Sequence, residues 1–212
     1  MGSQLTKNYD IEKEPHIMGG LHNFWKIYRG KKKDRGNMEV SIFVFDKKTI
    51  NKKDSTTGQQ QKEEVYNILK RDAANLAKYR HPSLLNLIEQ PMEDQKMIVF
   101  VTEPVEYNLS ALVFDASKKH LIPGDLEIKC IVLELMETLN FLHGTAKTIH
   151  SGLAPEHVYI TKEGKLKLAG FNFPLSFSTN EPVGVSHRQD LRINQLALVP
   201  NFRFAAPEVS QT

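Results

Sequence analysis

The chain is poor in several residue types, and each shortage excludes a class of protein. It has one cysteine among 212 residues, so no disulfide can form within it, which suits a reducing compartment. Because Cys130 falls in an apolar helical stretch, we expect it to pack as a small core residue. No run of about 18 apolar residues is present, which excludes a membrane-spanning helix. The net charge of +3 is too small to indicate a nucleic-acid partner.

The remaining composition is that of an ordinary globular chain, with 40% hydrophobic and 25% charged residues. The length predicts one domain, or one domain cut short. Basic residues gather in the first quarter, which predicts either a solvated loop or a surface for acidic lipids or a partner. They are Lys31, Lys32, Lys33, Arg35, Lys47, Lys48, Lys52 and Lys53.

The N-terminus carries one address-like pattern. Residues 1–6 fit M-G-x-x-x-[ST], which makes Gly2 a lipidation candidate. One acyl chain gives marginal, reversible membrane binding, so the pattern predicts peripheral membrane association at most. No secretory signal is visible, and the chain is expected to be cytoplasmic.

Hydrophobic periodicity divides the chain into two parts. Residues 40–46, 84–89 and 97–102 read as strands, and residues 60–79 read as a helix that ends at His81-Pro82. The polar residues 47–61 are expected to form a loop. Pro104 then breaks the pattern, because proline cannot donate to a ladder.

Beyond the break, the apolar face of residues 125–144 predicts a long helix that ends at Gly144. Residues 158–160 and 166–168 read as short strands, and residues 173–204 as an extended loop. The expected fold is α+β and bilobal. Residues 1–14 form an N-terminal segment, residues 15–103 a lobe with an antiparallel sheet and one helix, and residues 104–212 a partial helical lobe.

Residues 149–158 resemble the catalytic loop of protein kinases, H-R-D-L-K-P-E-N, in which Asp is the base and Asn binds a metal ion. Gly152 stands at the Asp position and His157 at the Asn position. The motif 170–172 (GFN) stands where kinases have D-F-G, and Phe43 takes the lysine position of V-A-I-K. Asp72 falls at the position of the helix glutamate. Residues 206–208 (APE) complete the order of motifs.

A closer resemblance is to the SCY-like pseudokinases, in the branch called coated-vesicle-associated kinase. Residues 25–27 (WKI), 43–48 (FVFDKK), 102–105 (TEPV), 141–143 (FLH) and 170–173 (GFNF) carry it. The resemblance implies an adaptor of clathrin-dependent traffic between Golgi, endosomes and plasma membrane. Its implied partners are proteins, including clathrin-coat or adaptor components on coated vesicles.

Phosphotransfer depends on charge stabilisation around the γ-phosphate, and the groups that supply it are lost. Phe43 has no charge, Gly170 and His157 replace the metal ligands, and Gly152 replaces the base. Removing one well-placed electrostatic group typically costs about 3–4 kcal/mol of transition-state energy. The sequence therefore predicts no catalytic residue and no resident cofactor, and it argues against Mg-ATP.

The nucleotide pocket implied by the frame is also degraded. G-x-G-x-x-G falls on Gly20, His22 and Trp25, so two side chains stand where the backbone should approach phosphate. A displaced Lys26 or Lys47 is a weak rescue, and Asp72 either pairs with one of them or is a solvated helix charge. The full set of pocket candidates is Gly19, Gly20, His22, Ile27, Ser41, Phe43, Thr102 as gatekeeper, Glu103, Val105 and Tyr159.

The packing groups are retained. By their place in the frame, Leu76, Leu87, His150 and Phe171 would stack across the two lobes as a structural spine. His150 and His157 do not indicate a metal site, because no cysteine or fixed helical spacing accompanies them. Burying Phe43 in an emptied cleft would contribute about 1.5–3 kcal/mol.

We therefore expect a catalytically inactive kinase-like domain that acts as a binding scaffold. Two alternatives stay open: an atypical Ser/Thr protein kinase with residual ATP binding, and a non-functional truncated fragment. The second follows because kinase domains continue past APE, so the apolar face of residues 125–144 would be partly uncovered.

Overall fold

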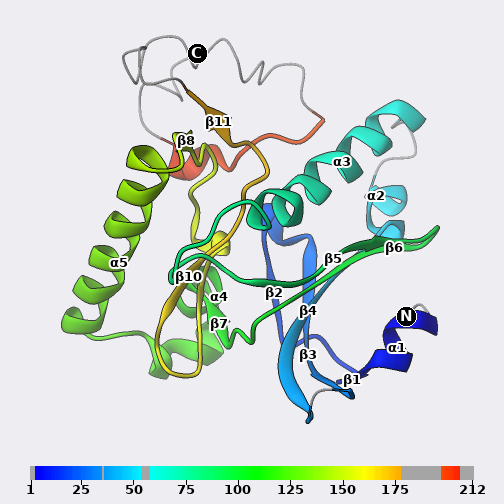
Figure 1. The fold of residues 1–212 in the computed structure, drawn as a ribbon, viewed down its shortest axis with the longest axis horizontal. Helices are drawn as coiled ribbons and strands as arrows, with labels where there is room; N and C mark the ends of the chain where they lie inside the picture. Colours follow the sequence, from blue (N-terminus) through cyan, green and yellow to red (C-terminus); the bar gives the residue numbers. More distant parts are fainter. Residues whose placement is uncertain (1–2, 35, 54–57, 178–196, 206–212) are drawn as a thin grey trace.

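A computed structural model describes residues 3–34, 36–53, 58–177 and 197–205, and it confirms the predicted α+β architecture. A sheet lobe and a helical lobe lie side by side, with α3 alongside the sheet and α5 on the opposite flank (Figure 1). The sheet lobe contains α1 (Ser3–Asn8), β1 (Tyr9–Ile11), β2 (Ile17–Gly19), η1 (Leu21–Asn23), β3 (Trp25–Lys32), β4 (Met38–Asp46), α2 (Lys48–Lys53), α3 (Gln59–Leu76), β5 (Leu87–Glu93) and β6 (Met97–Thr102).

The helical lobe is built from one long helix and several short elements. They are β7 (Tyr107–Asn108), α4 (Leu109–Phe114), η2 (Ala116–Leu121), α5 (Asp125–Gly144), β8 (Thr148–Ile149), η3 (Pro155–His157), β9 (Val158–Ile160), β10 (Leu166–Leu168), β11 (Leu175–Ser176) and η5 (Phe202–Phe204). The strands 158–160 and 166–168 lie where the sequence predicted them. They pair antiparallel as β9 and β10.

The large sheet is antiparallel in the order β1-β3-β4-β6-β5, with β2 paired to β3. β4 is its central strand, and its β-branched and aromatic residues are buried on both faces. Phe43 and Phe45 pack toward α3, while Val40, Ile42 and Val44 pack on the opposite face. Because side chains alternate along a strand, one strand serves two apolar clusters.

The structure differs from the sequence prediction at three places in the sheet lobe. Residues 9–11, expected within a separate N-terminal segment, form the edge strand β1 and pair with β3. Part of the expected polar loop 47–61 is the short helix α2. The strand expected at residues 84–89 begins at Leu87 and runs to Glu93. The polarity of the local sequence does not predict these elements, because they form through contacts with segments that are distant in the chain.

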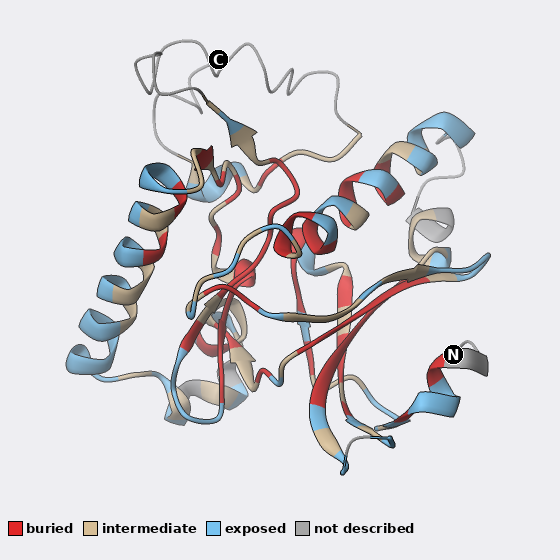
Figure 2. Cartoon of the chain, in the orientation of Figure 1, coloured by how far each residue is buried: buried red, intermediate tan, exposed pale blue. Residues whose placement is uncertain are grey.

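Helix α5 has the predicted bounds, but most of its surface is exposed (Figure 2). Leu126 is 71% exposed and Met136 is 61% exposed, while Thr138 and Leu142 are buried. The expectation that Cys130 is a core residue is wrong, because it lies on an exposed part of this helix. Among the described helices, none is both long and apolar enough to cross a membrane.

Candidate functional site

Five aromatic side chains form one buried cluster, and two of them, Phe43 and Tyr159, are predicted pocket residues. Trp25, Phe43, Phe45, Phe100 and Tyr159 are each at most 1% exposed. The Phe43 ring stacks on Phe100 with centroids 4.6 Å apart, and Trp25 meets Phe100 edge-on at 4.7 Å. Phe43 also meets Tyr159 edge-on at 5.6 Å. Such pairs add about 0.5–1.5 kcal/mol each to the burial of their area, so this aromatic cluster is a well-packed core.

The glycine turn, residues 19–24, lies directly on this aromatic cluster. A Cβ atom at Gly19 would lie 2.6 Å from the Tyr159 hydroxyl and 2.9 Å from Asn108 Nδ2. Gly20 has a φ of +64°, and a Cβ atom there would lie 2.3 Å from Trp25 Cδ1. Burial raises the pKa of the Tyr159 phenol well above its usual range. The glycines therefore permit close packing on protein side chains.

Two hydrogen bonds tie the glycine-turn region to the helical lobe. The Gly20 N–H donates to the Glu156 carbonyl at 2.9 Å. Asn108 Nδ2 donates to the Met18 carbonyl at 2.7 Å, while its Oδ1 caps α4 by accepting from Ala111 N. One of the turn's backbone donors is therefore already satisfied by protein.

In the hinge, residues 103–106, one backbone N–H group also has an acceptor within the protein. The Val105 N–H donates to Ser41 Oγ at 2.9 Å, and Ser41 is 1% exposed. Thr102 is fully buried and donates its hydroxyl to the Glu103 carbonyl. The Glu103 carboxylate lies 3.0 Å from Lys167 Nζ. An adenine would have to displace the Ser41 hydroxyl to use the Val105 N–H.

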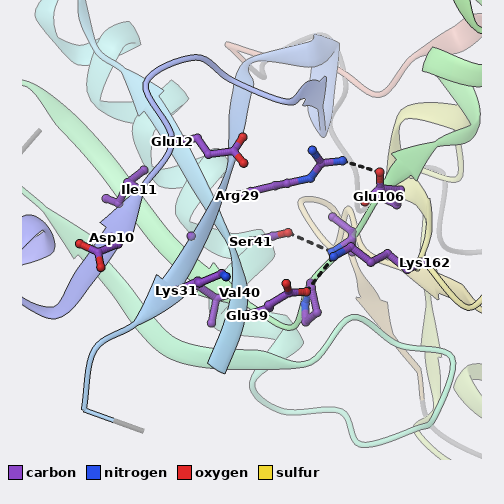
Figure 3. Close-up of a pocket in the computed structure, with 13 residues that line it drawn as sticks. Asp10, Ile11, Glu12, Arg29, Lys31, Glu39, Val40, Ser41, Glu106 and Lys162 are labelled. Atoms are coloured by element: carbon purple, nitrogen blue, oxygen red, sulfur yellow. Dashed lines mark hydrogen bonds and ion pairs between the residues drawn. The ribbon is translucent and has the colours of Figure 1, made fainter. Parts of the chain in front are cut away.

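A cavity of about 280 Å³ lies between β1, β3, β4 and the hinge (Figure 3). Only Ser41 and Val105 of the predicted pocket residues line it. Its charged lining comprises four acidic and three basic side chains: Asp10, Glu12, Glu39, Glu106, Arg29, Lys31 and Lys162. This balance does not favour a polyphosphate.

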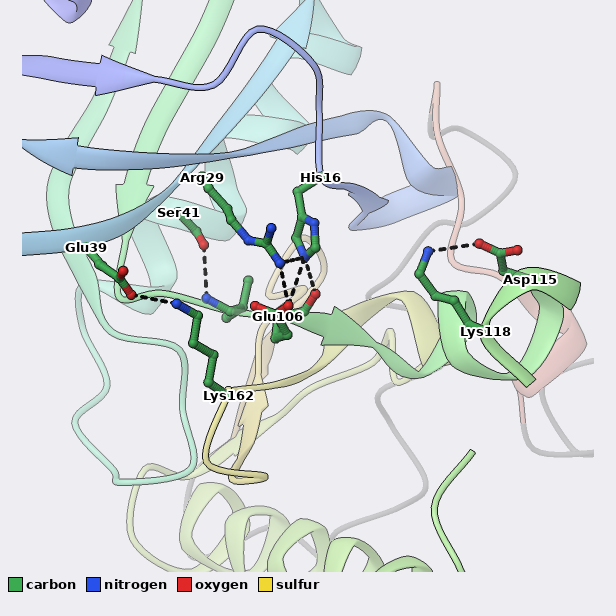
Figure 4. Close-up of polar contacts among 9 residues, drawn as sticks. His16, Arg29, Glu39, Ser41, Glu106, Asp115, Lys118 and Lys162 are labelled. Atoms are coloured by element: carbon green, nitrogen blue, oxygen red, sulfur yellow. Dashed lines mark hydrogen bonds and ion pairs between the residues drawn. The ribbon is translucent and has the colours of Figure 1, made fainter. Parts of the chain in front are cut away.

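Two of the three basic side chains that line this cavity form ion pairs with carboxylates of the same lining (Figure 4). Arg29 forms an ion pair with Glu106, and Lys162 Nζ lies 2.8 Å from Glu39. His16 contacts the Glu106 carbonyl, and burial lowers the pKa of its imidazole. The two basic side chains are therefore engaged by carboxylates of the chain itself.

Asp72 is a buried acceptor, which corrects both expectations for it. It is 3% exposed, and its Oδ1 accepts from the N–H groups of Gly170 and Phe171 at 2.9 and 2.8 Å. Burial raises the pKa of its carboxyl to about 6. Lys47, suggested as its partner, pairs with Glu93 at 2.6 Å. The Asp72 carboxylate therefore accepts hydrogen bonds from backbone N–H groups, whereas the acid at this position of a kinase pairs with the strand lysine.

Two amide side chains strengthen the same contact between α3 and residues 170–172, the GFN segment. Asn75 Nδ2 donates to the Phe171 carbonyl at 2.9 Å. Asn172 Nδ2 donates to the Ile68 carbonyl at 3.0 Å. With the two bonds to Asp72, four hydrogen bonds join helix and GFN segment. This geometry fixes α3 against the helical lobe without a salt bridge.

His157 and Gly170 share one volume. The ring of His157 is 1% exposed, and a Cβ atom on Gly170 would lie 2.2 Å from His157 Cγ. Gly170 has a φ of +87°, which also favours glycine. His157 Nδ1 donates to the Gly152 carbonyl at 2.7 Å, and burial lowers the pKa of this imidazole to about 4. Gly170 and His157, which stand at the two metal-ligand positions of the kinase motifs, are therefore packed against each other, and neither carries a charge near pH 7.

His150 contacts Phe171 of the GFN segment and the residue that precedes this segment. Its Nε2 donates to the Ala169 carbonyl at 2.8 Å, and its ring lies 4.6 Å from that of Phe171. Burial lowers the pKa of His150 to about 3, so it is neutral near pH 7. The structure places it, Phe171 and Leu76 in the interior, with Leu87 half-buried against the same core.

Sequence reasoning missed several features of the site. The motif spacing predicts that Trp25 obstructs a phosphate loop, whereas its buried ring packs against Gly20 of the glycine turn. The Ser41 and Asn108 hydrogen bonds join segments 64 and 90 residues away in the chain. The aromatic residues of β3 and β4, close to the glycines, were the signal in the sequence that could have predicted the buried aromatic cluster.

Three predicted features have no further structural account. Gly2 and the APE motif, residues 206–208, lie outside the described residues. His22 is exposed, and its Nε2 donates to the Val199 carbonyl at 2.9 Å. Within the described ranges, no three His, Cys, Asp or Glu side chains gather as they would around a metal ion.

Comparison with known proteins gives a family match over most of the chain. Residues 23–211 match the protein kinase domain. The chain is 34% identical to human (Homo sapiens) SCY1-like protein 2 and 33% identical to its mouse (Mus musculus) counterpart, over 98% of its own length in both cases. It is 32% identical to the protein kinase-like protein SCY1 of Saccharomyces cerevisiae over 80% of its length. In each case it spans 23% of the relative.

Proposed function

This chain belongs to the protein kinase family, in its SCY1-like branch, and we propose that it is a binding module without phosphotransferase activity. The observation that carries this proposal is the filled cleft. Trp25, Phe43 and Tyr159 occupy the volume beneath the glycine turn, and the Val105 N–H already donates to Ser41. A nucleotide would have to displace packed rings and gain no fixed cation in return.

The chemistry of the catalytic-loop frame supports the same proposal. Gly152 has no group that could accept a proton from a substrate hydroxyl. Gly170 and His157 are packed against each other, and the His157 imidazole is neutral near pH 7. Asp72, a buried acid of α3, has its Oδ1 committed to two backbone N–H groups. Magnesium prefers carboxylate and water oxygens, and Gly152, Gly170 and His157 carry no carboxylate.

Thermal unfolding with nucleotides tests the proposal. We expect no rise in the melting temperature with ATP or ADP, with or without magnesium or manganese, because a ligand raises stability only by binding the folded state. Tripolyphosphate serves as a control for non-specific binding to basic surface residues. A metal-dependent rise with ATP, absent with tripolyphosphate, would support the atypical kinase. Absence of a single cooperative melt would favour the truncated fragment.

We further propose that the module acts in clathrin-dependent vesicle traffic, because of its similarity to SCY1-like proteins. Coat or adaptor proteins are then its partners, and peripheral association with Golgi, endosomal or coated-vesicle membranes is its expected location. Because the chain spans about a quarter of its relatives, the test uses these 212 residues alone. Immobilised chain should retain purified clathrin or adaptor complexes, and failure to retain either would remove this role from it.

A further inference from the structure

A groove of about 390 Å³ lies on the connection between α3 and β5, outside the cleft. This connection leaves α3 after Leu76, passes beside β10 and enters β5 at Leu87 (Figure 1). The groove is lined by residues 79–82 and 84–86 of the connection together with Lys167 of β10. None of these residues belongs to the predicted nucleotide pocket or to the aromatic cluster. We call this feature the α3–β5 groove.

Hydrogen bonds to the helical lobe fix the shape of the connection. The Leu168 N–H donates to the Ser83 carbonyl at 2.8 Å, and the Leu85 N–H donates to the Leu168 carbonyl at 2.9 Å. The His81 ring stacks on Phe141 of α5, with ring centroids 4.8 Å apart. The groove is therefore formed before a ligand arrives, and this preorganisation lowers the cost of binding.

The ionisable side chains of the α3–β5 groove are all basic. Arg80, Lys167 and His81 line it, and its lining within the described part of the chain includes no carboxylate. Lys167 is already engaged, because its Nζ lies 3.0 Å from the Glu103 carboxylate and donates to the Pro82 carbonyl at 2.7 Å. The positive charge that remains available to a ligand is therefore that of Arg80.

The guanidinium of Arg80 is held in position and keeps most of its donors. Its Nη1 donates to Asn86 Oδ1 at 3.0 Å, and the Asn86 N–H in turn donates to Glu103 Oε1 at 2.8 Å. Across the described ranges, no carboxylate forms an ion pair with Arg80. A guanidinium carries five N–H donors in a planar fork that matches the two oxygens of a carboxylate. Because the Arg80 side chain is exposed, its other donors can reach a ligand.

Apolar groups form the rest of the groove. Leu84 and Leu85 are 3% and 1% exposed and belong to the main core cluster, and Tyr79 packs half-buried against the same cluster. Pro82 is exposed, and its ring carries no donor or acceptor. A ligand that fits the groove therefore combines an acidic group for Arg80 with an aliphatic group for the apolar wall.

We infer that the α3–β5 groove binds an acidic peptide segment of a protein partner. One carboxylate of the segment pairs with the Arg80 guanidinium, and a neighbouring aliphatic side chain packs on Tyr79 and Pro82. A phosphate group fits less well, because a dianion calls for more than one available cation and Lys167 is engaged by Glu103. An acidic membrane also fits less well, since a single basic residue contributes little to binding at such a surface.

The inference rests on the proposed function and deepens it, because it gives the binding module a docking surface and a class of partner. The groove shares no lining residue with the predicted nucleotide pocket, so the two proposals fail independently. A metal-dependent thermal shift with ATP would refute the module without phosphotransferase activity. A chain that binds neither ATP nor an acidic peptide would refute the groove alone.

The test titrates the whole 212-residue chain with a matched pair of peptides. The acidic probe is acetyl-Leu-Glu-Glu-Leu-amide, and acetyl-Leu-Gln-Gln-Leu-amide has nearly the same shape without charge. Binding is followed by NMR through the amide signals of residues 79–86 and 167 in isotope-labelled chain. We expect the acidic peptide to shift these signals and to bind about tenfold more tightly than the neutral one, because its hydrogen bonds are charge-assisted. High salt should weaken its binding.

Variants of the guanidinium locate the contact. Arg80→Ala should weaken binding of the acidic peptide about tenfold and leave the neutral peptide unaffected. Arg80→Lys keeps the charge and loses the planar fork, so its loss should be intermediate. The matched control is Arg71→Ala, which removes another exposed arginine, on α3, and should behave as the parent chain. Because both arginines are exposed, the urea midpoint of each variant should match that of the parent.

Equal affinity for the two peptides, or an affinity for the acidic peptide that Arg80→Ala leaves unchanged, would overturn the inference. Inorganic phosphate and vesicles containing phosphatidylserine serve as competing probes. Stronger shifts of the same signals with phosphate would assign the groove to phosphate groups, and vesicle binding that is lost in Arg80→Ala would assign it to membranes. Either result refutes an acidic peptide partner, and so does the absence of a shift with every probe.

Discussion

The aromatic cluster beneath the glycine turn and the segment 150–172 are held together in different ways. Beneath the glycine turn, aromatic rings pack against one another, and stability comes from buried apolar area. Around residues 150–172, neutral histidines, glycines and one carboxyl group are joined by hydrogen bonds to the backbone. The first, the aromatic side, should respond to changes in volume, whereas the second should respond to pH and to single polar substitutions.

The largest effect is expected on the aromatic side. Phe43→Ala would leave a cavity among Trp25, Phe100 and Tyr159 and should lower the free energy of unfolding by about 3–5 kcal/mol. Phe43→Leu keeps most of the volume and should cost clearly less. Urea unfolding of both variants measures the difference. If Phe43→Ala costs no more than the exposed Leu126→Ala, the rings do not form a packed core.

Restoring one charge on the other side should be nearly as harmful. Gly170→Asp forces a side chain into the His157 ring at a positive φ, and it should cost about 2–4 kcal/mol in urea unfolding. Gly152→Ala is the matched glycine control, since a Cβ atom there would make ordinary contacts, the nearest at 3.6 Å. The double variant His157→Asn/Gly170→Asp should be more stable than Gly170→Asp. Additive losses would show that the two residues do not share a volume.

The carboxyl of Asp72 provides a finer test of the same side. Asp72→Ala leaves the N–H groups of Gly170 and Phe171 buried without this acceptor, which should cost about 2–4 kcal/mol. Asp72→Asn keeps an acceptor oxygen and should retain most of the stability. Hydrogen exchange at residues 170–171 should rise only in the alanine variant. Equal losses in both variants would point to charge, and not to the hydrogen bonds, as the cause.

Acid should weaken the fold through the histidines. Burial lowers the pKa values of His150 and His157 from 6.5 to about 3 and about 4. Below pH 6.5 the unfolded chain therefore binds more protons than the folded chain, and the free energy of unfolding decreases as the pH is lowered. Asp72 has the opposite effect on stability. Its pKa is raised to about 6 in the folded chain, so the folded state takes up a proton there as the pH is lowered, and the neutral carboxyl is less costly to bury. With two histidines against one carboxyl, we expect a net loss of roughly 2 kcal/mol between pH 6.5 and 5.

Urea unfolding at pH 5, 5.75 and 6.5 measures this dependence. His157→Asn removes one of the two titrating imidazoles and should flatten the curve over this window. A steeper fall in that variant than in the parent chain would contradict the assignment to His157.

The smallest effect is expected at the hinge. Ser41→Ala removes the acceptor of the Val105 N–H and should cost about 0.5–1.5 kcal/mol. The aromatic cluster stays in place, so ATP should still give no thermal shift. A shift that appears only in Ser41→Ala would mean that the Ser41 hydroxyl, and not the aromatic cluster, excludes adenine.

The sequence predicted the fold well because its strongest signals are local and periodic. The bounds 125–144, 158–160 and 166–168 agree with α5, β9 and β10, and the family motifs give their order in space. Short elements such as β1 and α2 depend on pairing and packing across the lobe, so local polarity did not reveal them. Cys130 was misplaced because helical periodicity identifies an apolar face without telling whether anything covers it.

The candidate site was less predictable, for a related reason. The family motifs indicate which residues differ from the kinase pattern, at positions 43, 152, 157 and 170. They do not indicate which contacts these residues make, because the contacts join distant segments. Asp72 with the GFN segment and Ser41 with Val105 are such contacts, and each depends on backbone groups that no side-chain pattern records.

The shared volume of His157 and Gly170 has a consequence for how this chain can change over generations. A return to aspartate at position 170 alone would have to pass through a protein that folds poorly, since the imidazole occupies that place. A return to asparagine at position 157 alone would leave a gap and gain no ligand. The two positions therefore constrain each other, and a side chain at position 170 needs a smaller residue than histidine at position 157.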